Sequence, residues 1–292
     1  MSRRFWILSL LVGGALVASA LLRRSRPAPE ALAGVAARVV SLAPSTTEVI
    51  CALGLVDRLV GVCEFCEYPP EARAKPRMGG YYTPNFEVLS ETRPDLVVVL
   101  PEHGPILDRL RDLRLPVLEV DHRTVAGILD SFLAVSRACG VPERGVALRA
   151  ELEARLAKIK EAAKGRRRPR VLISVGRAMN EGSALRIATC GRGGFYDELL
   201  EMVGAENAYE GRVPYPSLSP EGVLALKPDV ILEIMPDLKE KGVSEEGLLK
   251  DWAAIPGVAG MRVKVIARDY AVIPGPRFVR LLEDLAEAVR LD

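Results

Sequence analysis

Residues 85–99, NFEVLSETRPDLVVV, return as residues 219–233, SPEGVLALKPDVILE, and this repeat decides the fold. Glu87 matches Glu221, and the Pro-Asp pair of one copy matches that of the other, all at a separation of 134 residues without a gap. Upstream of each copy, an apolar stretch (RVVSL, then RVLIS) matches as well. A repeat of this length predicts two similar lobes built from the same structural unit.

Each copy contains the signals for a short helix followed by a buried strand. Asn85 and Ser219 are good N-caps, Pro220 suits the first helical position, and the glutamate that follows is favoured by the helix dipole. The Pro-Asp pair ends the helix, and the apolar runs 96–100 and 230–234 are typical of buried parallel strands. We expect strands near residues 38–43, 58–62, 95–100 and 116–120 in the first lobe and near 170–175, 229–234, 263–267 and 271–273 in the second.

The alternation of strands and helices predicts an α/β fold in which each lobe has a mainly parallel sheet flanked by helices. Between the lobes, residues 125–139 and 143–164 have helical patterns, and the second stretch is rich in good helix formers. A helix of about 20 residues spans about 30 Å, so we expect a long, rigid backbone helix to join the lobes. The expected domains are an N-terminal α/β lobe at 37–124, a connecting helical backbone at 125–165 and a C-terminal α/β lobe at 166–292.

The N-terminus has the pattern of a targeting segment. Arg3 and Arg4 precede an uncharged run at 5–22, and the small residues at 18–20 resemble a cleavage site. Residues 1–22 are therefore either a cleaved signal peptide or a retained membrane anchor, and residues 23–36 are a Pro/Ala/Arg-rich linker. We expect a periplasmic or extracytoplasmic protein, soluble or tethered by an uncleaved N-terminal helix.

Composition and motifs bear on several function classes. The 40 basic and 38 acidic residues are interspersed and leave a net charge of +2, so we expect no nucleic-acid partner. The sequence has no Gly-x-Ser-x-Gly, His-Glu-x-x-His or phosphate-loop pattern, and we therefore expect no catalytic residues. A monomer is also expected. An enzyme or a membrane-tethered sensor on the same two-lobe scaffold is the alternative from another class.

Five cysteines leave at least one thiol unpaired in any intramolecular scheme. Cys63 and Cys66 have the spacing of a redox or zinc half-site, but no second Cys or His pair completes a tetrahedral zinc set. The alternatives are buried or incidental thiols, a local disulfide in an oxidising compartment, and redox chemistry.

Polar and aromatic residues follow the expected strands, where ligands of open α/β sheets bind. The adjacent tyrosines of a loop suit a large, flat, partly polar ligand, and an arginine suits a carboxylate or phosphate. His103 is a candidate axial ligand to iron or cobalt, or else a hydrogen-bonded loop histidine; with two histidines in the chain, a bare metal ion is disfavoured. The candidates derived in this way are Ser45, Tyr81, Tyr82, His103, Arg177 and Arg277.

The chain resembles the helical-backbone metal-receptor family, the periplasmic binding proteins for cobalamin, ferric siderophores and haem. The resemblance covers about Arg38 to Leu291. It is carried by VVSLAPSTTEV at 39–49, GVCEFCEYPP at 61–70, GGYYTPNFE at 79–87 and both Pro-Asp segments. It implies that Glu87 and Glu221 dock into arginines of an ABC transporter permease dimer, since a pseudo-twofold receptor should present the same charge twice to a twofold permease.

The resemblance also implies a function and further ligand contacts. It implies the substrate-binding protein of an ABC importer, which captures a metal chelate between its lobes, with contacts at Phe65, Tyr81 and the turn at Arg277. A cobalamin or other corrinoid is favoured and a ferric siderophore comes next, although Leu100 stands where a cobalamin receptor can carry tryptophan. Haem is third, because no arginine follows Tyr81 in Thr83-Pro84. No intrinsic cofactor is expected, since the ligand itself carries the chelated cobalt or iron.

Overall fold

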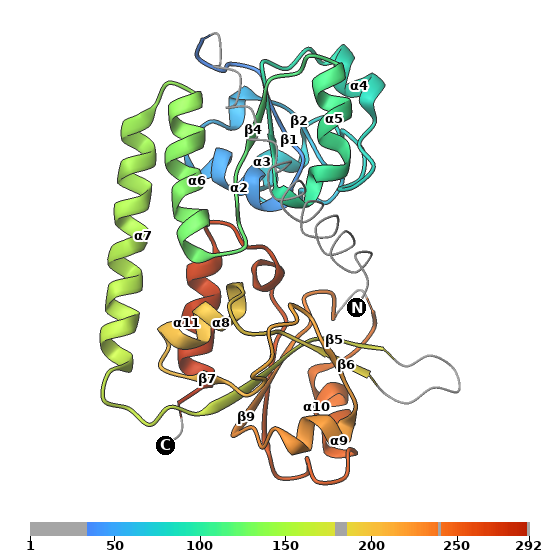
Figure 1. Cartoon of the computed structure of the whole chain (residues 1–292), viewed down its shortest axis with the longest axis vertical. Coiled ribbons are helices and arrows are strands. Elements are labelled where there is room, and N and C mark those ends of the chain that lie inside the picture. The colour runs from blue at the N-terminus through green and yellow to red at the C-terminus, as the bar shows by residue number, and fades with distance from the viewer. Residues whose placement is uncertain (1–33, 179–185, 239–240, 291–292) are drawn as a thin grey trace, which may run out of the picture. The chain divides into compact units, whose positions relative to one another are not determined.

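Two separate sheets carry the two copies of the repeat (Figure 1). The computed structural model describes residues 34–178, 186–238 and 241–290, and the described residues from Val35 onward form one compact unit. The first lobe contains β1 (Val39–Ser41), α2 (Pro44–Ala52), η1 (Val56–Arg58), β2 (Leu59–Val62), α3 (Pro70–Arg73), α4 (Phe86–Glu91), β3 (Leu96–Val99), η2 (Pro101–His103), α5 (Gly104–Asp112) and β4 (Val117–Glu119). Two helices follow, α6 (Val125–Ala138) and α7 (Pro142–Ala163). The second lobe contains β5 (Arg170–Ala178), β6 (Arg186–Thr189), α8 (Phe195–Met202), β7 (Glu206–Asn207), β8 (Ser217–Leu218), α9 (Pro220–Ala225), β9 (Val230–Ile234), α10 (Glu245–Ala253), β10 (Arg262–Ile266), η3 (Asp269–Val272) and α11 (Phe278–Ala288).

The two sheets share a central arrangement. In the first lobe the order is β2-β1-β3-β4 and every pair is parallel. In the second the order is β10-β9-β5-β6-β8, with β7 paired to β5. The strands β5, β7, β9 and β10 pair in parallel, while β6 and β8 are antiparallel additions. The predicted α/β fold with a mainly parallel sheet in each lobe is confirmed.

Seven of the eight expected strands are present, and one expectation is wrong. Residues 271–273 do not form a strand, because 269–272 turn as η3 and Pro274 and Pro276 cannot donate to a ladder. The sequence analysis also missed β6, β7 and β8. Two of these have only two residues each, too few for an alternating pattern to be seen.

The repeated Pro-Asp pair has the same structural role in both lobes. Asp95 accepts the backbone N–H of Arg38 at 2.8 Å, and Asp229 accepts that of Arg170 at 2.8 Å. Each aspartate thereby ties the start of β3 or β9 to the start of the neighbouring strand, β1 or β5. Charge-assisted hydrogen bonds to backbone N–H groups are about twice as strong as neutral ones, so the two carboxylates help to set the strand register.

The cores of the two lobes use equivalent positions of the repeat. Leu89 in α4 and Val223 in α9 are both fully buried, each under its own sheet. Val97 in β3 and Ile231 in β9 are buried in the same two clusters. The helix and strand of each copy therefore pack together to form part of one hydrophobic core per lobe.

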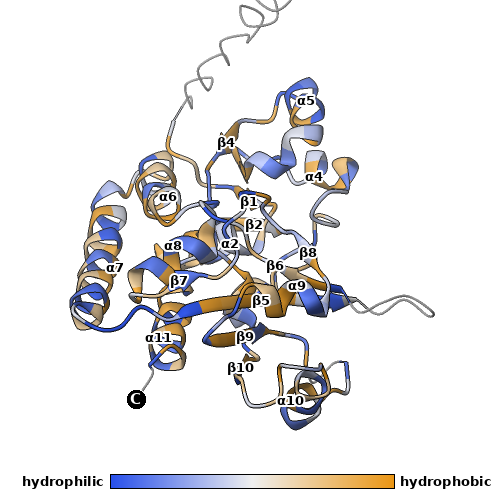
Figure 2. Cartoon of the chain, turned by 60° about the horizontal axis from the view of Figure 1, so that its bottom comes forward, coloured by the Kyte–Doolittle hydropathy of each residue, from blue (hydrophilic) through white to orange (hydrophobic). Residues whose placement is uncertain are grey.

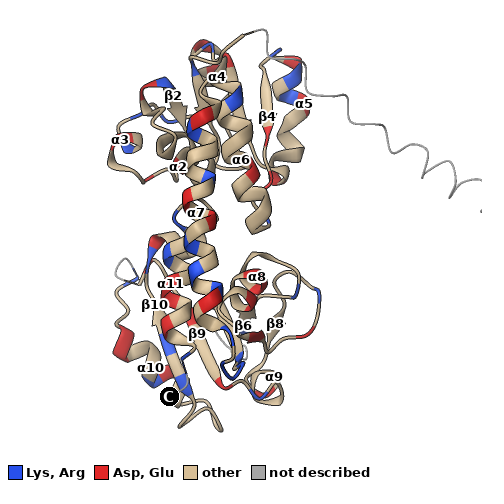
Figure 3. Ribbon diagram, turned by 90° about the vertical axis from the view of Figure 1, so that its left-hand side faces the viewer, with Lys and Arg blue, Asp and Glu red and all other residues tan. Residues whose placement is uncertain are grey.

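Helix α7 contacts both α6 and the second lobe. Arg149 binds Asp130 of α6 at 2.5 Å, and Arg155 binds Glu283 of α11 at 2.7 Å. Figure 2 shows hydrophilic and hydrophobic residues alternating along α7, and Figure 3 shows charges of both signs on its surface. A helix of 22 residues with an apolar stripe and an outer charged face braces the two lobes as the sequence predicted.

The expected targeting segment at 1–22 and nearly all of the linker at 23–36 lie outside the described residues. Within the described ranges, no helix combines the length and the apolar composition that crossing a membrane requires.

Candidate functional site

The loops at the carboxyl ends of the strands come together where the two lobes meet. The turn after η3 packs on the first turn of α2 so closely that a Cβ on Gly275 would lie 3.3 Å from the Cα of Ser45. Glu198 of α8 accepts the backbone N–H of Val125, at the start of α6, at 2.8 Å. We call this region the inter-lobe site; it comprises residues 43–48, 63–68, 79–84 and 100–103 of the first lobe and residues 209–216 and 268–277 of the second.

Arg277 is the main polar link across the inter-lobe site. It is 8% exposed, and its guanidinium donates to the Glu48 carboxylate at 2.6 Å and 3.0 Å. It also lies 2.7 Å from Asp269 and 3.8 Å from the centre of the Tyr68 ring. Burial lowers the pKa of Arg277, but the bonds to Glu48 and Asp269 outweigh it and raise that pKa overall. The charge of Arg277 is thus paired within the chain, and its contact with a ligand stays a prediction.

Aromatic side chains project from the loops of the first lobe. Phe65 is 59% exposed and Tyr82 is 62% exposed, so both are available for contact. Tyr81 is half-buried and packs edge-on against Tyr82, with ring centres 4.7 Å apart. Burial, followed by repulsion from Glu102, raises the pKa of Tyr81. Its phenol is therefore protonated at neutral pH and able to donate a hydrogen bond.

His103 supports Tyr81 from beneath. Its ring centre lies 4.4 Å from that of Tyr81, and the side chain is fully buried. The Nδ1 atom accepts the backbone N–H of Leu100 at 2.9 Å, which places the imidazole proton on Nε2. Burial lowers the pKa of His103, so the ring is neutral. Of the two alternatives from the sequence, this geometry is that of a hydrogen-bonded loop histidine; axial ligation stays a prediction.

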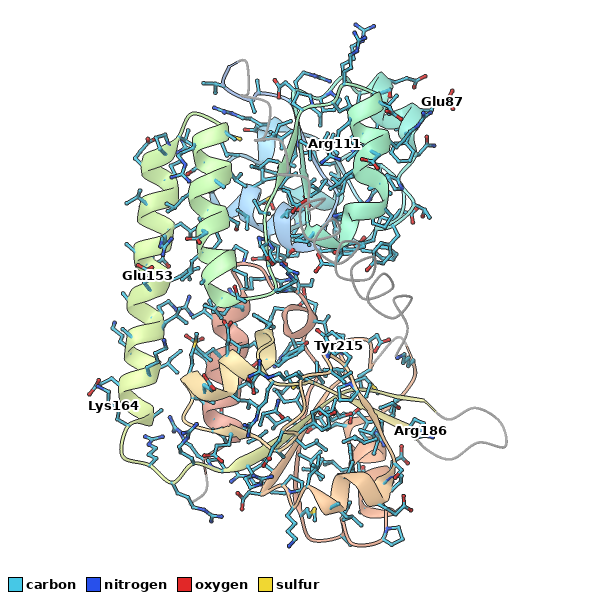
Figure 4. All side chains as sticks on the ribbon, in the orientation of Figure 1. Glu87, Arg111, Glu153, Lys164, Arg186 and Tyr215 are labelled. Carbon is cyan, nitrogen blue, oxygen red and sulfur yellow. The ribbon has the colours of Figure 1, made fainter. Side chains whose placement is uncertain are left out.

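Tyr215 is a candidate that the sequence analysis missed. It lies between β7 and β8, is 62% exposed, and is on the side of the second lobe that faces the first in Figure 4. Desolvation raises its pKa, and Glu102 of the first lobe contributes to the shift. Tyr215 stands 134 residues after Tyr81, which is the offset of the repeat. Extending the repeat upstream of Asn85 and Ser219 would have identified it.

Arg177 is directed into the second lobe. Its Nε lies 3.4 Å from Glu233 of β9, and its guanidinium lies 5.2 Å from the centre of the Trp252 ring. The indole N–H of Trp252 donates to the other oxygen of Glu233 at 3.0 Å. The structure therefore surrounds Arg177 with partners from β9 and α10, and ligand contact by Arg177 stays a prediction.

Ser45 is joined to a histidine in the interior of the first lobe. Its Oγ lies 2.9 Å from Nδ1 of His122, and both side chains are 3% exposed. Burial lowers the pKa of His122 to about 4. Its Nε2 has no hydrogen-bond partner among the described residues. The pair is thus buried beneath the site, and ligand contact by Ser45 stays a prediction.

Glu87 and Glu221 occupy equivalent, exposed positions. Asn85 caps α4 by accepting the N–H groups of Glu87 and Val88, and Ser219 caps α9 by accepting that of Gly222. Both N-caps match the prediction. In Figure 1, α4 and α9 lie toward the two ends of the molecule on the side away from α7, and Figure 4 shows Glu87 at the outer surface of its lobe.

Other polar and concave features lie apart from these residues. Among the described residues, no group of three or more His, Cys, Asp or Glu side chains is placed to hold a metal ion. A groove of about 760 Å³ runs between α7 and α11 and contains none of the inter-lobe residues.

Known proteins resemble this chain over most of its length. The sequence profile of the family described as periplasmic binding proteins matches residues 39–269. A vitamin B12-binding protein of Vibrio cholerae is 28% identical over 88% of this chain and 90% of its own length. An uncharacterized ABC transporter substrate-binding lipoprotein of Bacillus subtilis is 28% identical over 87% of this chain and 80% of its own length. The solved periplasmic haem-binding protein of Roseiflexus, in its apo form, is 29% identical, with a TM-score of 0.71 over 87% of this chain and 98% of that one.

Proposed function

We propose a role in corrinoid capture for this chain, which belongs to the periplasmic binding protein family. In this proposal the chain holds a cobalamin or related corrinoid between its lobes and delivers it to the permease of an ABC importer. The chelated cobalt arrives with the ligand, and the protein supplies no cofactor and no catalysis. The cobalamin and ABC transporter relatives, each 28% identical, support this proposal.

The observation that carries the proposal is the pair of tyrosines related by the repeat. Tyr81 from the first lobe and Tyr215 from the second both have a raised pKa to which Glu102 contributes. Their aromatic faces, together with exposed Phe65 and Tyr82, offer apolar contact, while the hydroxyl groups offer hydrogen bonds. A corrin is large and flat, with amide side chains at its edge, and needs both kinds of contact.

Haem is the second candidate, because a haem-binding protein is among the similar structures at 29% identity. Tyrosine binds haem iron as the phenolate, and Tyr81 is the half-buried phenol of the site. The protonated phenol of Tyr81, whose pKa burial raises, can also donate to an amide oxygen at the edge of a corrin, so Tyr81 suits either ligand.

The first prediction concerns Tyr215. Titration calorimetry of the purified protein with cyanocobalamin should show one bound ligand, and Tyr215→Ala should raise the Kd about tenfold, or about 1.4 kcal/mol, because a large aromatic contact is lost. Val146→Ala is the matched control, since Val146 is equally exposed but lies on α7.

Haemin titrated in parallel separates the two candidates. Binding heat with haemin but not with cyanocobalamin would identify haem, rather than a corrinoid, as the ligand. An unchanged Kd in Tyr215→Ala would remove the second lobe from the proposed contact surface.

A further inference from the structure

The thiols of Cys63 and Cys66 lie close together beneath the loop that follows β2. Their Sγ atoms are 3.2 Å apart, and neither side chain is exposed. Thr47 of α2 donates its hydroxyl proton to the Sγ of Cys66 at 3.1 Å. The two residues flank Glu64 and Phe65, and Phe65 is exposed at the tip of the loop. The loop thus exposes the Phe65 ring, and the two adjacent sulfur atoms lie buried at the ends of the loop.

The backbone of this loop is held by contacts that do not involve sulfur. The N–H of Cys66 donates to the carbonyl of Cys63 at 3.2 Å, which closes a turn. Arg77 donates through Nη1 to the carbonyls of both cysteines, at 3.1 Å and 2.9 Å. Because these bonds already bring the two side chains together, joining the sulfur atoms requires little further movement.

We propose that Cys63 and Cys66 are joined by a disulfide bond in the mature protein, and that this bond closes the loop that presents Phe65. The other three cysteines of the chain stay as thiols. The proposal does not depend on which ligand is bound. It fits the oxidising compartment in which periplasmic binding proteins work, where thiol pairs of this kind persist as disulfides.

The oxidant is a disulfide, either of a small thiol such as glutathione or of a thiol–disulfide oxidoreductase. The Cys63 thiolate attacks one sulfur of the oxidant, and the first thiol leaves with a proton from solvent. The Cys66 thiolate then attacks the Cys63 sulfur of the mixed disulfide, and the second thiol leaves. The protein pair gives up two protons and two electrons, and the oxidant becomes two thiols.

Once the loop turn has formed during folding, a hydrogen bond from Cys66 lowers the pKa of Cys63, so Cys63 is the more easily deprotonated thiol of the pair. Burial raises the pKa of Cys51, Cys139 and Cys190, so these thiols react more slowly in the folded protein. Since both sulfur atoms are inaccessible in the fold, the bond forms while the chain folds and is then shielded from reductant.

Peptide mapping of the full chain tests the proposal. The protein is refolded from urea with oxidised and reduced glutathione, unfolded again in iodoacetamide and digested with trypsin. Peptide 59–73 contains Cys63 and Cys66 and no internal Lys or Arg. We expect it to carry no alkyl group and to be lighter than the reduced peptide by the mass of two hydrogen atoms. Peptide 39–58, with Cys51 alone, should be fully alkylated and is the internal control.

Hydrogen exchange on the folded protein provides a second measurement. Amides at 64–67 should exchange several-fold more slowly in the oxidised protein than in protein reduced in urea and refolded without oxidant, while those of the second lobe stay unchanged. Two alkyl groups on peptide 59–73 without prior reduction would overturn the disulfide. Equal exchange at 64–67 in both forms would overturn its effect on the Phe65 loop.

Discussion

At the residue scale, His122 is a neutral histidine inside a lobe, and it makes stability depend on pH. Burial lowers its pKa from 6.5 to about 4, and Asp121 offsets this shift only in part. Between these two values the unfolded chain binds more protons than the folded one, so stability rises with pH. The contribution is complete above pH 6.5 and is lost as the pH falls toward 4.

We therefore expect acid to destabilise the protein by up to about 3 kcal/mol over this interval through His122 alone. Urea unfolding of the wild type and of His122→Gln at several pH values measures the effect. The slope of unfolding free energy against pH should be smaller in His122→Gln. His103, whose pKa burial also lowers, is present in both proteins and cancels in the comparison; equal slopes would contradict the assignment.

Single residues also show how far the sequence was informative. The repeat predicted both N-caps, Asn85 and Ser219, because capping depends on local chemistry. It did not predict that Asp95 and Asp229 accept the N–H groups of Arg38 and Arg170, since this requires knowing which strands are neighbours. Nor did it predict the partner of Arg277, because Glu48 lies 229 residues away in the chain.

At the scale of elements, the short helices α4 and α9 are the equivalent helices of the two repeat copies, each with a glutamate in its first turn. Both glutamates are exposed, and the bond from Ser219 lowers the pKa of Glu221. The helix dipole stabilises an exposed charge in the first turn by only about 0.3–1 kcal/mol, and both carboxylates stay accessible to a partner. Docking on a permease stays a prediction for both residues.

We expect the double variant Glu87→Lys, Glu221→Lys to bind cyanocobalamin with unchanged Kd and to lose uptake. Each introduced lysine would face an arginine of the permease and be repelled by it. Uptake of labelled cyanocobalamin by cells with the cognate permease measures this. Glu91→Lys, which reverses an exposed charge on the same helix, is the control and should transport normally. Persistent uptake in the double variant would mean that docking uses another surface.

Two of the strands that were not predicted, β6 and β8, form the antiparallel edge of the second sheet. Strand β6 pairs with β5 and β8 pairs with β6, outside the parallel part of the sheet that the repeat defines. By contrast, α7 was predicted to within a few residues, because its composition and length are local signals.

At the scale of the whole molecule, the buried pair of Glu48 and Arg277 fastens one lobe to the other. Arg277→Met should destabilise the protein by about 3–5 kcal/mol, because the Glu48 carboxylate is left buried without its partner. The double variant Glu48→Gln, Arg277→Met should lose less stability than Arg277→Met alone, because no unpaired carboxylate is left buried. Arg155→Met, which breaks a more exposed pair with Glu283, should cost at most about 1 kcal/mol. Urea denaturation measures the unfolding free energy of all three variants. A small loss of stability in Arg277→Met would contradict a stabilising role for the Glu48–Arg277 pair.

Two lobes joined by a helix and a buried ion pair should change their arrangement little when the ligand binds. Helix α7 and the Glu48–Arg277 pair both join the two lobes, so we expect the ligand-free and ligand-bound proteins to present Glu87 and Glu221, the predicted docking residues, in nearly the same positions. Ligand-free protein should then compete with ligand-bound protein for the predicted docking site on the permease. Import should therefore slow when the binding protein is in excess of both its ligand and the permease.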